Sequence, residues 1–171
     1  ISRALETIAW SVGVPQHRVH YLPNGAWHAS PGNAERVRQR HALGNAPVLL
    51  LYTRFFEYDV ERPLEVLERV LQRVPEVRLL VVGEGLFTDD DRRFDASIAD
   101  RGLGTKVVRA GWVKMERLPD YFAAADVAIY PLDDTLVNRC KGVLKLVDLL
   151  AAGVPVVADR VGEHALLGEV V

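Results

Sequence analysis

The sequence has one cysteine, Cys140, and no apolar run long enough to cross a bilayer. A single cysteine cannot form an internal disulfide, which favours a reducing compartment. A membrane helix needs roughly 18 or more apolar residues in a row, and the longest apolar stretch is interrupted by Asp148, Gly153 and Pro155. No segment resembles a signal peptide. We therefore expect a cytoplasmic protein with no membrane span in this chain.

An excess of charge of one sign is also lacking. The 21 Lys and Arg residues nearly balance the 23 Asp and Glu residues, giving a formal net charge of −2. A chain without a basic excess has no field that would attract nucleic acid or an anionic membrane. Any recognition of phosphate must therefore depend on a few well-placed groups.

Several motifs of common enzymes are absent as well. The loop that follows the first strong apolar run, residues 53–62, contains no glycine, so the glycine-rich turn of NAD or FAD sites is missing. No P-loop and no G-x-S-x-G motif occur. His17 and His20 have no third ligand in view, so we expect no metal.

The sequence does contain a regular alternation of short apolar runs and amphipathic segments. Strands are predicted at residues 48–54, 77–83, 105–111, 126–131 and 154–159, and helices at 63–74, 90–102, 117–125 and 142–153, with another starting in 162–169. Strands that are apolar throughout are typical of sheets covered by helices on both faces. The predicted fold class is α/β, a doubly wound and mainly parallel sheet.

Residues 1–46 are less regular. They predict a helix at 2–13, a short strand at 18–25 that ends in a Pro-Asn-Gly turn, and a helix at 33–44 capped by Asn33. We expect residues 1–46 to be a helical linker segment packed on a Rossmann-like domain formed by 47–171. Because the chain starts without Met and ends on apolar residues, we also expect a fragment of a larger, two-domain protein.

In open α/β sheets, ligands bind beyond the carboxyl ends of the strands. Arg54 stands at the first of these ends, and Gly111 begins a loop at the third. Lys141, Lys145 and Asp148 are spaced so that they share one stripe of a helix, and we expect this stripe to face the crevice.

The order and spacing of "GVPQHRVHYLPNG", "LLLYTR", "PEVRLLVVGEG", "VVRAGWV", "LPDYFAAADVAIYP" and "LKLVDLLAAGVPVVA" resemble the C-terminal, nucleotide-sugar-binding half of GT-B glycosyltransferases. The resemblance is to the large retaining family 4 group, and it covers nearly the whole chain. It implies a Rossmann-like donor domain that lacks its N-terminal, acceptor-binding partner domain.

The resemblance also implies roles for individual residues. Arg54 corresponds to the arginine that holds the donor diphosphate, and Asp148 to an acid that accepts hydrogen bonds from the ribose hydroxyls. We expect Lys145 to join Arg54 in stabilising the leaving diphosphate, so both are candidate catalytic residues, while the amides of Gly142 and Val143 offer the positive end of a helix. The nucleobase would contact the loop formed by Gly111, Trp112, Val113 and Lys114.

Two positions depart from the pattern of the family. The lysine that follows the family's arginine is missing, because "FEYDVER" offers acids there, and the first acid of the family's pair is replaced by Cys140. Lys145 is the residue that would supply the missing positive charge. Asp133 and Asp134 lie near the missing acid in sequence.

The predicted function is transfer of a hexose-type sugar from a nucleotide diphosphate donor, with retention and without a metal or other cofactor. Two alternatives are a sugar-nucleotide epimerase of the same architecture and a non-catalytic binding or scaffold domain. At single positions, Arg54 could instead form a surface ion pair, Asp148 could pair with Lys145, and Trp112 could be a packing residue.

Overall fold

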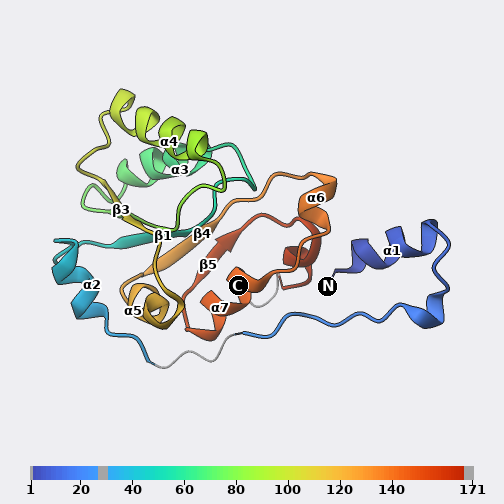
Figure 1. Cartoon of the computed structure of the whole chain (residues 1–171). Coiled ribbons are helices and arrows are strands. Elements are labelled where there is room, and N and C mark those ends of the chain that lie inside the picture. Colours follow the sequence, from blue (N-terminus) through green and yellow to red (C-terminus); the bar gives the residue numbers. More distant parts are fainter. Residues whose placement is uncertain (1, 27–30, 168–171) are drawn as a thin grey trace.

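The computed structural model describes residues 2–26 and 31–167, and its centre is a five-stranded parallel sheet (Figure 1). The strands are β1 (Val48–Tyr52), β2 (Arg78–Val82), β3 (Val107–Gly111), β4 (Val127–Tyr130) and β5 (Val156–Ala158). Their spatial order is β3-β2-β1-β4-β5, and all four pairings are parallel. The predicted α/β, doubly wound fold is confirmed.

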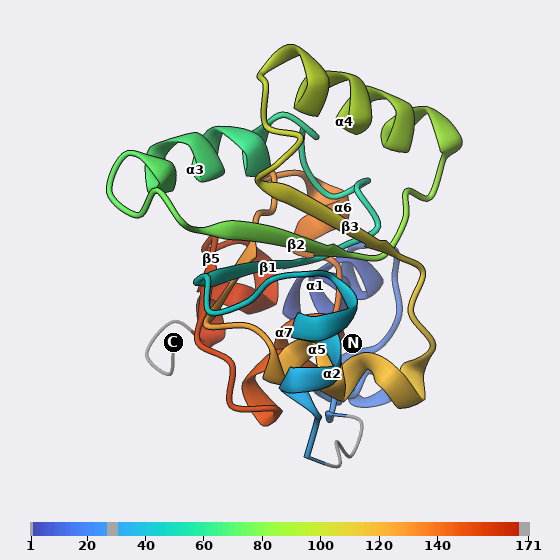
Figure 2. The same cartoon turned by 90° about the vertical axis from the view of Figure 1, so that its left-hand side faces the viewer.

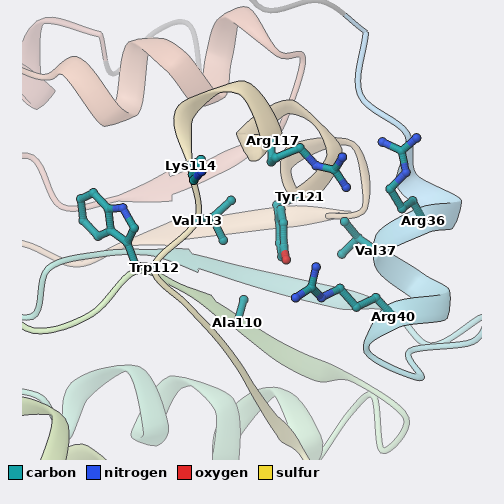
Figure 3. A pocket seen from close by; sticks show the side chains of 9 residues that line it. All are labelled: Arg36, Val37, Arg40, Ala110, Trp112, Val113, Lys114, Arg117 and Tyr121. Atoms are coloured by element: carbon teal, nitrogen blue, oxygen red, sulfur yellow. The ribbon is translucent and has the colours of Figure 1, made fainter.

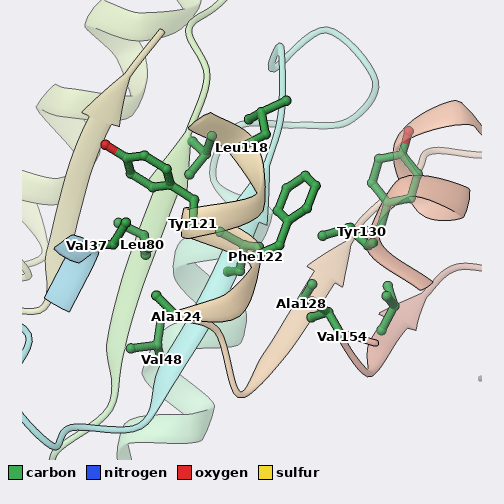
Figure 4. Packing of buried hydrophobic residues seen from close by; sticks show 14 of the residues in the cluster. Val37, Val48, Leu80, Leu118, Tyr121, Phe122, Ala124, Ala128, Tyr130 and Val154 are labelled. Carbon is green, nitrogen blue, oxygen red and sulfur yellow. The ribbon is translucent and has the colours of Figure 1, made fainter. Parts of the chain in front are cut away.

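Helices cover both faces of the sheet, as the apolar strands predict (Figure 2). One face packs under α3 (Arg62–Leu71) and α4 (Thr88–Asp100), around buried residues such as Leu51, Leu64 and Phe94. The other face packs against α2 (Ala34–Arg40), α5 (Leu118–Ala123) and α7 (Leu144–Ala151). Figure 4 shows this second core, in which side chains of α5 lie against those of the strands.

Helix ends follow the predicted signals at most positions. Pro63 lies in the first turn of α3, where its missing N–H costs nothing. Gly102 and Gly153 follow α4 and α7 with φ values of +66° and +76°, the left-handed conformation that ends a helix. At its other end, α7 begins at Leu144, so Gly142 precedes the helix that the sequence placed it in.

The N-terminal segment differs from the prediction in one respect. It contains α1 (Arg3–Ser11) and the 3-10 turn η1 (Gln16–Arg18), but residues 18–25 form no strand. The backbone at Val19 is extended, yet no strand pairs with it, because the described sheet ends at β3 on one side and β5 on the other. The Asn33 cap is confirmed, since its Oδ1 accepts the Arg36 N–H of α2 at 3.1 Å.

The remaining elements are short. They are η2 (Met115–Arg117), α6 (Leu136–Arg139) and η3 (Gly162–Leu166). The last is a 3-10 helix where the start of a helix was predicted over 162–169, and residues 168 and 169 lie outside the described residues. Within residues 2–26 and 31–167, no helix has the length and apolar character to span a bilayer.

Candidate functional site

The candidate site lies where the strand order reverses. The chain builds β1, β2 and β3 in one direction and then crosses to the other side of β1 to form β4 and β5. At such a switch point the loops after the two central strands diverge and leave a crevice at their carboxyl ends. The loop after β1 carries Arg54, and α7, which connects β4 with β5, carries Lys145 and Asp148.

A tight turn fixes the start of the loop after β1. The Thr53 hydroxyl oxygen accepts the Phe55 N–H at 2.9 Å and lies 2.5 Å from the Tyr58 hydroxyl. Phe55 has a φ of +60°, which is unfavourable for a large side chain, and its burial against Phe94, with ring centroids 4.7 Å apart, holds it there. The turn therefore sets the direction in which Arg54 leaves the sheet.

The Arg54 guanidinium stacks on an aromatic ring, and one of its nitrogens lacks a hydrogen-bond partner among the described residues. Its guanidinium carbon lies 5.0 Å from the centre of the Trp112 ring, a cation–π contact. Its Nε is buried, with no hydrogen-bond partner among the described residues. Trp112 is 61% exposed, so it lies outside the core and packs only at the surface, against Arg54. The arrangement leaves a guanidinium with donors available to a ligand.

Lys145 projects from α7 into a buried environment. Its Nζ lies 3.2 and 3.4 Å from the two carboxylate oxygens of Glu57, and 5.8 and 6.0 Å from the ring centres of Tyr52 and Tyr130. Burial lowers the pKa of Lys145, while the Glu57 carboxylate opposes that shift. The lysine therefore pairs with Glu57, a partner that sequence spacing did not reveal.

Asp148 lies on the same side of the molecule as Arg54. It lines a cavity of about 200 Å³ together with Tyr52, Leu144 and Gly25. The pKa of Tyr52 is raised by burial and by the charge of Asp148, and is lowered by the charge of Arg54. The charges of Arg54 and Asp148 therefore both act on one hydroxyl, that of Tyr52 at the end of β1.

Gly142 and Val143 form the approach to α7. Val143 is the N-cap residue and supplies no side-chain cap, so the amide end of the helix is not closed by its own sequence. A Cβ on Gly142 would lie 2.2 Å from Nδ2 of Asn24. Asn24 lies in the stretch where the sequence predicts a Pro-Asn-Gly turn, but residues 23–25 form no turn in the structure. Asn24 instead packs against the residues that precede α7, a contact that the sequence did not reveal.

Glu57 was missed by the sequence analysis, and Lys141 was expected on the helix stripe but precedes α7, which begins at Leu144. Glu57 is 5% exposed. Lys141 has its Nζ 3.7 Å from Glu57 and 3.8 Å from the centre of the Phe56 ring, and this buried Nζ makes no hydrogen bond within the described residues. The acids of "FEYDVER" were the available signal for Glu57, but only the fold shows that Glu57 meets two lysines.

The predicted nucleobase loop runs along the edge of the sheet. Gly111 ends β3 with a φ of +68°, its carbonyl accepts the Gly83 N–H at 2.9 Å, and the Trp112 N–H donates to Glu84 at 3.1 Å. A cavity of about 500 Å³ opens beside this loop (Figure 3). Its lining residues are Arg36, Val37, Arg40, Ala110, Trp112, Val113, Lys114, Arg117 and Tyr121.

Comparisons with known proteins find glycosyltransferases. The family model described as "Glycosyl transferases group 1" matches residues 46–170. A GDP-mannose-dependent alpha-(1-6)-phosphatidylinositol monomannoside mannosyltransferase of Mycolicibacterium smegmatis is 30% identical over 156 residues, which are 86% of this chain and 40% of the relative. The sulfoquinovosyl transferase SQD2 of Arabidopsis thaliana is 27% identical over 74% of this chain and 22% of the relative.

Solved structures share the fold. The Anabaena protein HepE, in complex with UDP and glucose, superposes with a TM-score of 0.72 at 22% identity, covering 97% of this chain and 45% of HepE. A glycosyltransferase from Rickettsia africae superposes with a TM-score of 0.73 at 14% identity, covering 95% and 44%. The chain thus spans less than half the length of each of these relatives and structures.

Proposed function

This chain belongs to the group 1 glycosyl transferases, and we propose that it is the donor-binding half of an enzyme that transfers a hexose-type sugar from a nucleotide diphosphate. What supports the proposal is that the Lys145 Nζ lies 5.8 Å from the centre of the Tyr52 ring, that Asp148 lines a cavity with Tyr52, and that the charges of Arg54 and Asp148 both act on the Tyr52 pKa. Two cations and one acid match the two parts of a nucleoside diphosphate, its phosphates and its ribose.

The proposed chemical task of this half is to stabilise the leaving group. When the bond between the sugar and the diphosphate breaks, negative charge grows on the phosphate oxygens. A guanidinium can hold two of these oxygens at once, and a buried ammonium interacts strongly with charge in a site that water does not fill. In this proposal Arg54 and Lys145 are the catalytic groups, and the amides of Gly142 and Val143 assist them.

The remaining contacts would select the nucleoside. Asp148 is an acceptor placed in a cavity with Tyr52, and it suits the two hydroxyls of a ribose. In the loop that begins at Gly111, Trp112, Val113 and Lys114 border the larger cavity at the sheet edge, where main-chain groups can meet a base. We propose that the transfer proceeds with retention, as the resemblance to the retaining family 4 group implies. We also propose that it needs no metal, because the side chains of Arg54 and Lys145 would neutralise the diphosphate.

We further propose that the acceptor binds to a domain outside this chain. The support is that the chain spans 40% of the Mycolicibacterium relative and 45% of HepE. In this proposal the active site is completed only when the second domain closes over the crevice. This half should therefore bind a nucleotide without transferring a sugar.

A panel of nucleoside diphosphates tests the proposal. The full-length protein is heated with UDP, GDP, ADP, CDP or TDP, and the unfolding temperature is measured. A ligand at 100 times its dissociation constant adds about 2.7 kcal/mol to apparent stability, so one base should give a clear upward shift. No shift with any of the five, at millimolar concentration, would remove the proposed donor site.

A second assay separates transfer from epimerisation. The full-length protein is incubated with the sugar nucleotide of the selected base, with and without candidate acceptors. We expect release of nucleoside diphosphate only when an acceptor is present. Formation of an epimerised donor without acceptor would replace the transferase by an epimerase.

A further inference from the structure

The loop after β1 places a carboxylate in a crevice that is otherwise suited to anions. Glu57 is 5% exposed. A buried carboxylate is unfavourable unless cations or donors surround it, and beside a diphosphate it would also repel the ligand. Its presence therefore needs a specific reason, which its contacts supply.

The backbone of Glu57 is fixed from the other half of the sheet. Its carbonyl oxygen accepts the Asp133 N–H at 3.0 Å and the side-chain amide of Asn138 at 2.7 Å. Asn138 is itself buried, and it also donates to the Asp133 carbonyl at 2.8 Å. The connection between β4 and α7 thus determines where the Glu57 carboxylate lies.

Two lysines converge on that carboxylate. The Lys145 Nζ is within hydrogen-bond distance of both oxygens, at 3.2 and 3.4 Å, whereas Lys141 stays at 3.7 Å and lies over Phe56. Arg54, Lys141, Lys145 and Glu57 together carry two net positive charges, and the nearby Asp148 reduces this to one. The crevice thus keeps an excess of positive charge for a diphosphate while Glu57 stays in place.

We propose that Glu57 is a positioning residue that holds the Lys145 ammonium, charged and in one place, for the donor diphosphate. This inference rests on the proposed function. The loop position where the family pattern has a lysine supplies instead an acid, Glu57, that holds Lys145 of α7.

The physical consequence concerns the proton on Lys145. Burial lowers the pKa of Lys145, and the Glu57 carboxylate raises it. Removal of the Glu57 charge would let the pKa of Lys145 fall further, so the ammonium would lose its proton at a lower pH. Other charged or titratable groups lie around the pair: Arg54, Lys141, Tyr52, Tyr58, Tyr130, Asp148 and His164. The pKa values of all three tyrosines are raised, so these side chains stay neutral over the range tested.

Calorimetry on the full-length protein tests the inference. The dissociation constant of the nucleoside diphosphate chosen by the panel is measured from pH 7 to 9.5 for wild type, Glu57→Gln, Glu57→Asp, Lys145→Met and Glu61→Gln. Titration of the ligand itself is common to all variants and cancels in the comparison. Glu61 is a matched control from the same loop, because its carboxylate binds Ser97 and Arg101 instead of the crevice lysines.

In wild type we expect the affinity for the nucleoside diphosphate to fall at alkaline pH, as Lys145 loses its proton. Lys145→Met should weaken binding by about tenfold or more and should abolish this alkaline loss of affinity. Glu57→Gln should move that alkaline loss to lower pH than in wild type, Glu57→Asp should be intermediate, and Glu61→Gln should match wild type. The shift in pH separates positioning from a general loss of structure, which would weaken binding equally at every pH.

Two results have distinct meanings. If wild type binds no nucleoside diphosphate, the proposed function fails. If wild type binds, Lys145→Met weakens binding and Glu57→Gln keeps the wild-type pH profile, only the role of Glu57 is overturned. Should Glu57→Gln fail to fold, Glu57→Asp decides in the same way, since a wild-type profile there would also overturn the role.

Discussion

Arg54 owes its position to its neighbours in the chain. Phe55 takes a left-handed backbone conformation with φ of +60°, which costs about 1 kcal/mol or more for a non-glycine residue. Buried contacts of Phe55 with Phe94 and the hydroxyl of Thr53 oppose this cost. The strained turn fixes the backbone next to Arg54, whose Nε has no hydrogen-bond partner among the described residues. A cation held in this way is typical of a preorganised binding group.

The first prediction concerns Arg54. In the full-length enzyme, Arg54→Ala should lower the rate of sugar transfer by about a hundredfold, because one preorganised donor to a developing anion contributes roughly 3 to 4 kcal/mol. Steady-state kinetics at saturating donor measure this effect. Arg92→Ala, which removes a guanidinium whose side chain is 76% exposed in a surface ion pair, is the control and should leave the rate unchanged. A change below about threefold for Arg54→Ala would exclude this residue from the site.

At the scale of elements, one carboxylate joins two helices beside the larger cavity. Asp120 of α5 accepts the Asn33 N–H at 2.7 Å and the Arg36 guanidinium at 3.0 Å, so it holds the first turn of α2. The Asn33 N–H, then Arg36, lower the pKa of the Asp120 carboxyl. The charge of Asp120 therefore stabilises the folded chain.

The second prediction is a pH dependence of that stability. A carboxyl whose folded pKa is depressed contributes stability above its unfolded pKa, about 3.9, and loses it as the pH falls through the folded pKa. Asp120→Asn should therefore lower the free energy of unfolding at pH 7, and the difference from wild type should shrink as the pH falls below about 4. Denaturant titrations at several pH values measure this. A difference that stays constant with pH would show that the charge is not responsible.

The third prediction concerns the close approach of β1 and β2. Gly83 has a φ of +114°, and a Cβ there would lie 2.0 Å from the Thr53 carbonyl oxygen, a backbone atom that cannot move away cheaply. Gly83→Ala should lower the free energy of unfolding by about 2 kcal/mol or more. Gly104→Ala is the matched control, because its Cβ would meet nothing within 4 Å, and it should change stability by less than about 0.5 kcal/mol. Equal effects of the two changes would contradict this account.

The strands and most helix ends could be predicted from the sequence because they depend on local patterns. Apolar runs such as 78–82 and stop signals such as Gly153 need no tertiary information. The failures depend on partners. Residues 18–25 have the pattern of a strand but no neighbour to pair with, and Gly142 lies before α7 instead of inside it.

The same distinction separates the parts of the site. Arg54 and Asp148 could be predicted, because strand ends and helix stripes locate them and a family resemblance gives them roles. Glu57 and Asn24 could not, since each acts through a residue more than about eighty positions away in the chain. A buried ion pair leaves no periodic signal in the sequence, and the fold alone shows that Glu57 and Lys145 meet.

At the scale of the whole molecule, the N-terminal segment is tied to residues far along the chain. The Ser2 hydroxyl donates to the Cys140 carbonyl at 2.9 Å, and Glu163 accepts the Arg3 N–H at 2.8 Å and the Tyr21 hydroxyl at 2.5 Å. Glu163 is 5% exposed. These contacts hold the segment that carries Asn24 against the crevice.

The fourth prediction follows from Glu163. Glu163→Ala leaves the Arg3 N–H and the Tyr21 hydroxyl without their acceptor, and should lower the free energy of unfolding by about 1 to 3 kcal/mol. Limited proteolysis should then cleave the first 26 residues faster than in wild type. Glu163→Gln keeps an acceptor oxygen, so its free energy of unfolding and its cleavage rate should lie between those of wild type and Glu163→Ala. Unchanged stability and unchanged cleavage for Glu163→Ala would show that the segment is held by other contacts.

The contact of Asn24 with Gly142 has a consequence for biosynthesis. The ribosome synthesises Asn24 more than a hundred residues before Gly142, and before any strand of the sheet. Contacts between such distant residues form late in folding. Under the proposed function, a nascent chain therefore cannot bind a nucleotide until nearly all of this sequence has emerged, and the nucleotide cannot assist the early stages of folding.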